Sequence, residues 1–194
     1  MDKPPALHAH AADNLRFIRD TMSRAGQFTA VPGWGGVTMG ITAIAAATLA
    51  SRAASRNEWL TWWFGEAALA IGIAAVTMSR KARRLELPLL AAPARRFAFA
   101  YMPPLAAGAV LTAVLIGNGL WQRLPGCWLL LYGVAIATAG TLSVRVVQLM
   151  GLVFMALGAA SFATPATYGD LFMAAGFGGL HIVFGLIIAR NHGG

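Results

Sequence analysis

Two ionisable residues, Glu66 and His181, lie inside apolar stretches of this sequence and are the first candidates for chemistry. Glu66 lies in "WWFGEAALAIG" and His181 lies in "AGFGGLHIVFGL". A carboxylate at the centre of a membrane-spanning helix costs about 2.5–3.5 kcal/mol, several times the free energy that one Leu or Ile returns. Glu66 therefore needs a partner, water or a proton, and a nearby imidazole could share a proton with it.

The depth of the two residues is similar. With a rise of about 1.5 Å per residue, Glu66 lies about 10 Å below Trp59 and His181 about 16 Å below Asp170, both measured from the outer ends of their helices. If the second and the last apolar segments are neighbours, the two side chains can form a hydrogen bond. Three interpretations stay open: a pair that locks the bundle, a proton-coupled or ligand site in the outer half of the membrane, and a Glu66 that reaches the outer interface.

The obligatory residues of several membrane enzymes and cofactor proteins are absent from the sequence. Lys3 and Lys81 lie outside the apolar runs, which excludes a retinal Schiff base, and His181 is the one intramembrane histidine, which excludes bis-histidine haem ligation. The single Cys127 excludes a CxxC pair. A rhomboid-type protease would need a serine within hydrogen-bond reach of His181, whereas Ser143 lies at the predicted cytoplasmic end of the fourth span, far from the middle depth of His181. We therefore expect no enzyme, no cofactor and no bound metal.

The helices that position these residues follow from composition. Hydrophobic residues make up 58% and charged residues 11% of 194 residues, against roughly 45–50% and 25% in a soluble domain. The sequence predicts an all-α, polytopic transmembrane bundle over 31–194. Its six spans are 31–51, 59–78, 97–117, 125–142, 146–162 and 170–189. Pro103 and Pro104 either start the third span or kink it, and if they start it, "RFAFAYM" lies along the interface.

Residues 1–30 form a separate predicted unit, a cytoplasmic N-terminal segment with an amphipathic helix. Ala11, Leu15, Ile18 and Met22 share one face of this helix. Such a helix would lie flat on the inner membrane surface. A short helix that is solvated, or that packs against a partner, fits the same pattern.

Basic residues set the predicted orientation and account for the net charge of +8. Most fall in the connections of one side, which places both termini in the cytoplasm and argues against nucleic-acid binding. Tryptophans near the outer ends of spans two to four agree with this orientation as interfacial residues, namely Trp59, Trp62, Trp63, Trp121 and Trp128. The loop between spans two and three is a candidate for anionic lipid, through Arg80, Lys81, Arg83, Arg84, Arg95 and Arg96. The same charges also fit a topology signal alone.

Glycines seven residues apart predict close helix packing. The pattern comprises Gly33 and Gly40, Gly65 and Gly72, Gly133 and Gly140, Gly151 and Gly158, and Gly178 and Gly185, with Gly36 completing a GxxxG motif. Heptad spacing keeps such pairs on one stripe of a helix, where small residues allow backbones to approach closely in lipid. The stripes predict a tightly packed bundle that could also self-associate.

The segments "LPGCWLLLYG", "SVRVVQLMG" and "AAGFGGLHIVFGLIIARNHGG" resemble an uncharacterised family of small bacterial inner-membrane proteins. The resemblance covers most of the chain and implies six spans and the bacterial inner membrane, but no activity and no site residues. Two functions stay open. The first is a non-enzymatic membrane module that forms a homo-oligomer or joins other membrane subunits, and the second is a small-molecule or proton-coupled carrier that uses Glu66 and His181.

Overall fold

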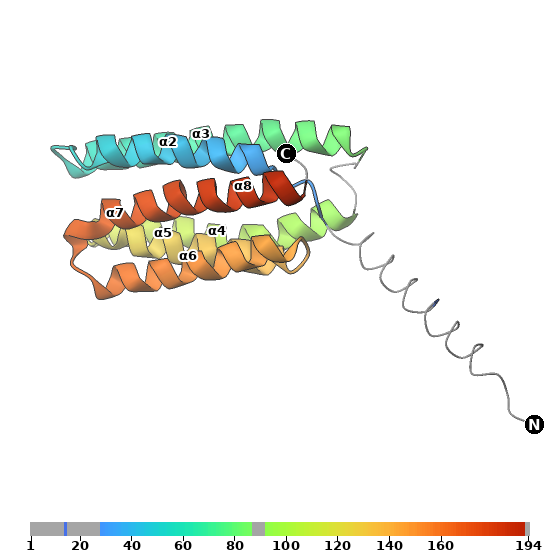
Figure 1. The fold of residues 1–194 in the computed structure, drawn as a ribbon. Coiled ribbons are helices and arrows are strands. Elements are labelled where there is room, and N and C mark those ends of the chain that lie inside the picture. The colour runs from blue at the N-terminus through green and yellow to red at the C-terminus, as the bar shows by residue number, and fades with distance from the viewer. Residues whose placement is uncertain (1–13, 15–27, 87–91, 193–194) are drawn as a thin grey trace, which may run out of the picture.

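The protein is an all-α bundle, described in a computed structural model for residues 14, 28–86 and 92–192. Six helical segments in this part of the chain are long and apolar enough to cross a membrane. Five of them are α2 (Gly33–Ala50), α3 (Arg56–Arg84), α4 (Ala92–Gly117), α5 (Leu124–Gly140), preceded by the 3₁₀ turn η1 (Trp121–Arg123), and α6 (Arg145–Ala163) (Figure 1). The predicted fold class and the six spans are confirmed, while the predicted N-terminal helix lies almost entirely outside the described residues.

The last span is a continuous helix whose type changes along its length. It consists of η2 (Ala166–Tyr168), α7 (Gly169–Met173), the π-helix η3 (Ala174–Leu180) and α8 (His181–Asn191). The sequence of η3 is "AAGFGGL", and three glycines in seven residues let the backbone widen into π-turns with little steric cost. π-Turns inside a helix often mark functional sites. Here the π-helix ends directly before His181.

Two antiparallel helix pairs are packed through glycine and form the rigid part of the bundle. A Cβ added at Gly40 of α2 would lie 2.6 Å from the Gly178 carbonyl oxygen, and one at Gly185 would lie 2.7 Å from the Val37 nitrogen. Similar contacts join α5 to α6, where a Cβ at Gly133 would lie 2.6 Å from the Met155 nitrogen. The structure uses Gly33, Gly36, Gly40, Gly133, Gly140, Gly151, Gly158, Gly178 and Gly185 in this way.

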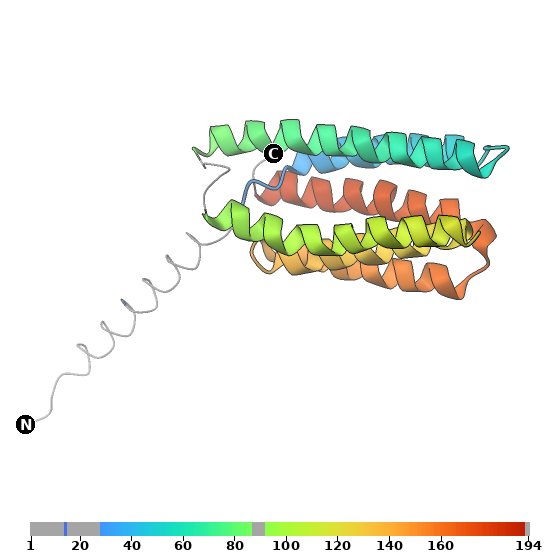
Figure 2. The same ribbon diagram turned by 180° about the vertical axis from the view of Figure 1, so that it is seen from behind.

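Helices α3 and α4 lie on the same side of the bundle, and each packs mainly on one neighbour. α3 packs on α2 and α4 packs on α5, while the last span is visible between them from behind (Figure 2). The prediction that Gly65 and Gly72 of α3 pack against another helix is wrong within this chain, because a Cβ at either position meets no atom within 4 Å. Both glycines lie on the exposed face of α3.

The two prolines predicted either to start or to kink the third span lie inside α4, which begins at Ala92. Pro104 has no N–H, so the carbonyl of Ala100 lacks its usual intrahelical donor. The hydroxyl of Thr138 on α5 lies 3.0 Å from this carbonyl and can donate to it, in competition with the Val134 carbonyl of its own helix at 2.8 Å. Because an unsatisfied carbonyl is costly in lipid, this side-chain bond lets α4 continue through the prolines and fixes it against α5.

Candidate functional site

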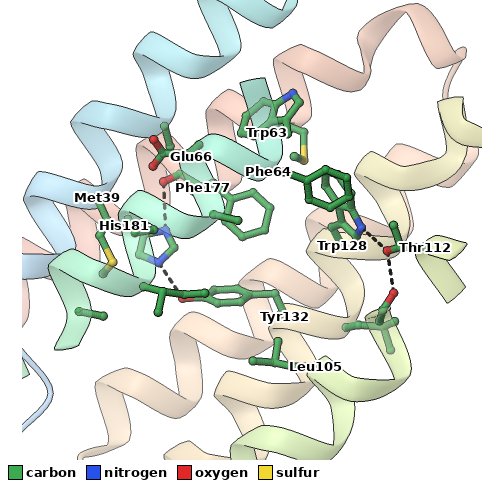
Figure 3. Close-up of a pocket in the computed structure, with 18 of the residues that line it drawn as sticks. Met39, Trp63, Phe64, Glu66, Leu105, Thr112, Trp128, Tyr132, Phe177 and His181 are labelled. Carbon is green, nitrogen blue, oxygen red and sulfur yellow. Dashed lines mark hydrogen bonds between the residues drawn. The ribbon is translucent and has the colours of Figure 1, made fainter. Parts of the chain in front are cut away.

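A cavity of about 480 Å³ opens between α3 and α4 and is the candidate functional site. Its walls come from these two helices, and its floor comes from α2, α5 and the last span, as the residues in Figure 3 show. Wall residues such as Phe64 and Ile71 are 49% and 71% exposed on the outside of the bundle. The volume falls within the roughly 300–1,000 Å³ typical of small-molecule sites. The cavity therefore opens sideways, at the height of the apolar spans.

Glu66 lines this cavity from α3 and is 9% exposed. One carboxyl oxygen, Oε1, accepts a 2.8 Å hydrogen bond from the hydroxyl of Thr42 on α2. The other oxygen, Oε2, has no hydrogen-bond partner among residues 28–86 and 92–192. Within these residues every side-chain nitrogen or oxygen that is fully buried has a partner. Oε2 therefore keeps some accessible surface, on a residue that lines the cavity.

His181 lines the same cavity and is 5% exposed. Its Nδ1 lies 3.0 Å from the carbonyl oxygen of Phe177, and its Nε2 lies 2.8 Å from the hydroxyl of Tyr132 (Figure 3). A carbonyl only accepts, so Nδ1 carries the hydrogen and donates it. In the neutral imidazole Nε2 is then the acceptor, and Tyr132 donates to it. The bonds fix the orientation and the tautomer of the ring.

The structure brings Glu66 and His181 to one cavity but does not pair them. Glu66 bonds to Thr42, and His181 bonds to Phe177 and Tyr132. The reason is that α2, rather than α3, packs along the last span, so α2 supplies the partner of Glu66. The interpretation of the two residues as a directly bonded pair is therefore corrected, although both remain groups of a single site.

Six aromatic rings complete the lining of the cavity: Trp63, Phe64, Tyr101, Trp128, Tyr132 and Phe177. They form two groups of contacting rings, with centroids 5.1 Å apart for Tyr132 and Phe177 in one group and 5.8 Å apart for Phe64 and Trp128 in the other. The indole N–H of Trp128 donates to Thr112 at 2.7 Å, and Thr112 donates to the Gly108 carbonyl at 2.7 Å. The polar atoms of this wall are thus largely bonded within the protein.

Sequence reasoning missed Thr42, Tyr132 and Phe177 as members of this site. Tyr132 is the single hydroxyl in "WLLLYGVAI", and an isolated polar group in an apolar span is a usable signal. Nothing comparable marks Thr42, because threonines in membrane helices commonly bond to their own backbone. Phe177 contributes through its carbonyl, and only the π-helix places that atom.

Two of the five tryptophans predicted near the interface, Trp59 and Trp63, are buried against other helices. Trp59 and Trp63 of α3 lie inside the bundle, where their indole N–H groups donate to the Asp170 carboxylate at 2.7 and 3.4 Å. Asp170 sits within the first turn of α7 and makes no side-chain cap bond there. These bonds tie the N-terminal end of α3 to the start of the last span, at one end of the cavity.

Lys81 is not a surface residue as the lipid-site prediction required. It is 5% exposed, and its ammonium donates to the carbonyls of Val31 and His192 at 2.9 and 2.8 Å. A cation at the carboxyl end of α8 is favoured by the helix dipole, so Lys81 ties α3 to the start of α2 and the end of α8. The other five residues of the predicted lipid site are exposed at the same end, namely Arg80, Arg83, Arg84, Arg95 and Arg96.

Residues of the types that hold metals or act as nucleophiles were located in the part of the chain that the structure describes. These residues contain no group of three or more His, Cys, Asp or Glu side chains that could hold a metal ion. Cys127 is buried. Ser143 donates its hydroxyl to the Phe28 carbonyl at 2.6 Å rather than to a histidine.

The fold and the cavity together define an all-α bundle with six helical segments apolar enough to cross a membrane and a side-opening apolar site. No family model matches the chain, and neither a curated protein nor a solved structure matches it. The resemblance to small bacterial inner-membrane proteins remains a prediction.

Proposed function

We propose that this chain is a non-enzymatic membrane protein that binds an apolar or amphiphilic small molecule, which enters from the bilayer between α3 and α4. The observation that carries this proposal is the cavity of about 480 Å³ whose two walls belong to helices that do not pack along one another. Its lining is mostly aromatic and aliphatic, with a few polar groups held in fixed positions, which is the usual character of a small-molecule site.

The location and the orientation belong to the same proposal. We infer that the bundle lies in a bacterial inner membrane with both termini in the cytoplasm. Support comes from the exposed arginines at the end where α3 finishes and α4 begins, a larger set than Arg52, Arg56 and Arg123 at the opposite end. Arg80, Arg83, Arg84, Arg95 and Arg96 would contact anionic lipid at that surface.

Binding in the cavity is compatible with transport but does not require it. A small-molecule or proton-coupled carrier would bind its substrate in the same cavity, which Glu66 and His181 line. Irregular turns within a membrane helix often accompany functional sites, and the π-helix η3 ends directly before His181.

Self-association, or docking with another membrane subunit, is the second candidate function. The observation that favours it is the exposed face of α3, where Gly65 and Gly72 lie beside the exposed side chains of Trp62 and Leu69. Small residues that meet nothing within their own chain are available for close approach by another helix. This contact would leave the cavity free, so both functions can coexist.

The proposal is tested with an uncharged lipophilic fluorophore, N-phenyl-1-naphthylamine, whose emission rises in apolar surroundings. The protein in phosphatidylcholine nanodiscs should bind it saturably, above the partitioning seen with empty nanodiscs. Ala70→Trp, which fills the cavity, should abolish the saturable component. Ala68→Trp is the matched control, because Ala68 is exposed on the same helix and does not line the cavity. Absence of saturable binding to the wild type, or equal binding by both variants, would reject the proposal.

A further inference from the structure

The carboxyl group of Glu66 is the one charged group placed to meet a molecule in the cavity. Its Oε1 already accepts from Thr42, so Oε2 is the atom left for a ligand. The residue is 9% exposed and lines the cavity, so the surface it keeps is small and includes part of the cavity wall. A ligand that approaches Oε2 therefore meets a fixed acceptor in apolar surroundings, where electrostatic attraction is only weakly screened.

Nothing on the described walls of the cavity supplies a positive charge to Glu66. No Lys or Arg is among the described residues that line it. The titratable groups that share the cavity are His181, Tyr101 and Tyr132, and both ring nitrogens of His181 already have partners in Phe177 and Tyr132. The charge that best complements the carboxylate is therefore one carried by the ligand.

The aromatic lining independently favours the same kind of ligand. Six aromatic rings line one space, and they come from four elements of the bundle: α3, α4, α5 and η3. The negative faces of Trp, Tyr and Phe rings attract cations, and cages of such rings are a recurring way to bind quaternary ammonium groups. Anions gain nothing from these faces. The carboxylate and the rings thus select for the same sign of charge.

We infer that the cavity binds an amphiphilic cation, an ammonium-type or phosphonium-type positive charge on an apolar body, with the charge held by Glu66 and the aromatic rings. This inference rests on the proposed function, since it names the ligand class of the same cavity. The apolar body enters sideways past Phe64 and Ile71, which are exposed on the outside of the bundle. Glu66 is a binding residue, and Thr42 positions its carboxylate.

The test compares two probes of nearly the same shape and opposite charge, tetraphenylphosphonium and tetraphenylborate. Each is titrated against the full-length protein in phosphatidylcholine nanodiscs, with partitioning into empty nanodiscs subtracted. Glu66→Gln is compared with Glu58→Gln, the same change on the same helix. Glu58 accepts from the Ala54 N–H at the start of α3, and glutamine is accepted at this capping position, so the control should fold normally. N-phenyl-1-naphthylamine reports in each variant whether the cavity itself is intact.

We expect tetraphenylphosphonium to bind at least about tenfold more tightly than tetraphenylborate, and Glu66→Gln to remove about that preference. Glu58→Gln should change neither value, and binding of the neutral probe should persist in both variants. Equal binding of the two ions to the wild type, with neutral-probe binding intact, overturns the cation inference and leaves the proposed function standing. Loss of all saturable binding, neutral probe included, overturns the proposed function. If Glu66→Gln does not fold, the comparison of the two ions on the wild type still decides.

Discussion

Gly133 of α5 provides a quantitative test of the packing that holds the bundle together. A Cβ at this position would lie 2.6 Å from the Met155 nitrogen and 2.8 Å from the Gly151 carbonyl oxygen, whereas ordinary contacts begin at 3.4 Å. Gly133→Ala therefore forces α5 and α6 apart by up to about 0.8 Å. A gap of that size forfeits about a quarter to a half of the dispersion attraction between the facing atoms.

The expected magnitude follows from two opposing effects. Overpacking costs about 1–3 kcal/mol, and the contacts of Gly133 with backbone atoms put it at about 2–3 kcal/mol, of which the better helix propensity of alanine returns about 1 kcal/mol. A net loss of about 1–2 kcal/mol corresponds to a fall in Tm of roughly 2–8 °C for a chain of this size. Gly72→Ala on α3 is the matched control, because its Cβ meets nothing within 4 Å. Its Tm should stay the same or rise slightly.

The assay is thermal unfolding in detergent, followed by the loss of the monodisperse peak in size-exclusion chromatography. A Gly133→Ala protein as stable as the wild type would refute the close approach of α5 and α6. A Gly72→Ala protein that loses as much stability as Gly133→Ala would show that Gly72 is packed, and a second copy of the chain would then be the first partner to test.

Three further predictions follow from other contacts. Thr138→Val should lower stability by about 1–2 kcal/mol in the same thermal assay, because it strands the carbonyl that Pro104 leaves unpaired; an unchanged Tm would contradict this role. Lys81→Met should lower the free energy of unfolding by about 1.5–3 kcal/mol, because it removes the charged donor of two carbonyls, whereas Arg80→Met should lower it by less than about 0.5 kcal/mol. Equal losses in the two variants would show that the buried position of Lys81 does not contribute to stability. A cysteine at Gln122 should react with an impermeant maleimide in intact spheroplasts while one at Arg83 reacts only after lysis, and the reverse pattern would invert the orientation.

The fold could be predicted because the membrane imposes simple rules on sequence. A span must be helical and must have about 20 apolar residues, so the six runs could be located to within a few residues. The exceptions have local causes. α3 runs to Arg84, beyond its apolar stretch, since a helix can continue into the aqueous region when charged residues follow. The outcome for Pro103 and Pro104 depended on Thr138, a residue of another helix.

The candidate site could be predicted only in part. Glu66 and His181 were recognisable because ionisable groups in apolar spans are expensive, and both do line one cavity. Their hydrogen-bond partners, Thr42, Phe177 and Tyr132, could not be predicted, because the hydropathy pattern does not show which helices are neighbours. The glycine stripes illustrate the same limit. Gly40 and Gly133 are packed, while Gly65 and Gly72, with the same spacing, face outward.

The most direct measurement is the position of a bound probe. Crystals of the protein grown in a lipid mesophase with a bromine-labelled N-phenyl-1-naphthylamine would locate the bromine by its anomalous scattering. We expect an anomalous peak inside the cavity, between Ala70 of α3 and Leu105 of α4, with α3 and α4 separated by the bound molecule. Bromine found only on the outer surface of the bundle, or α3 packed along α4 with the cavity closed, would contradict it.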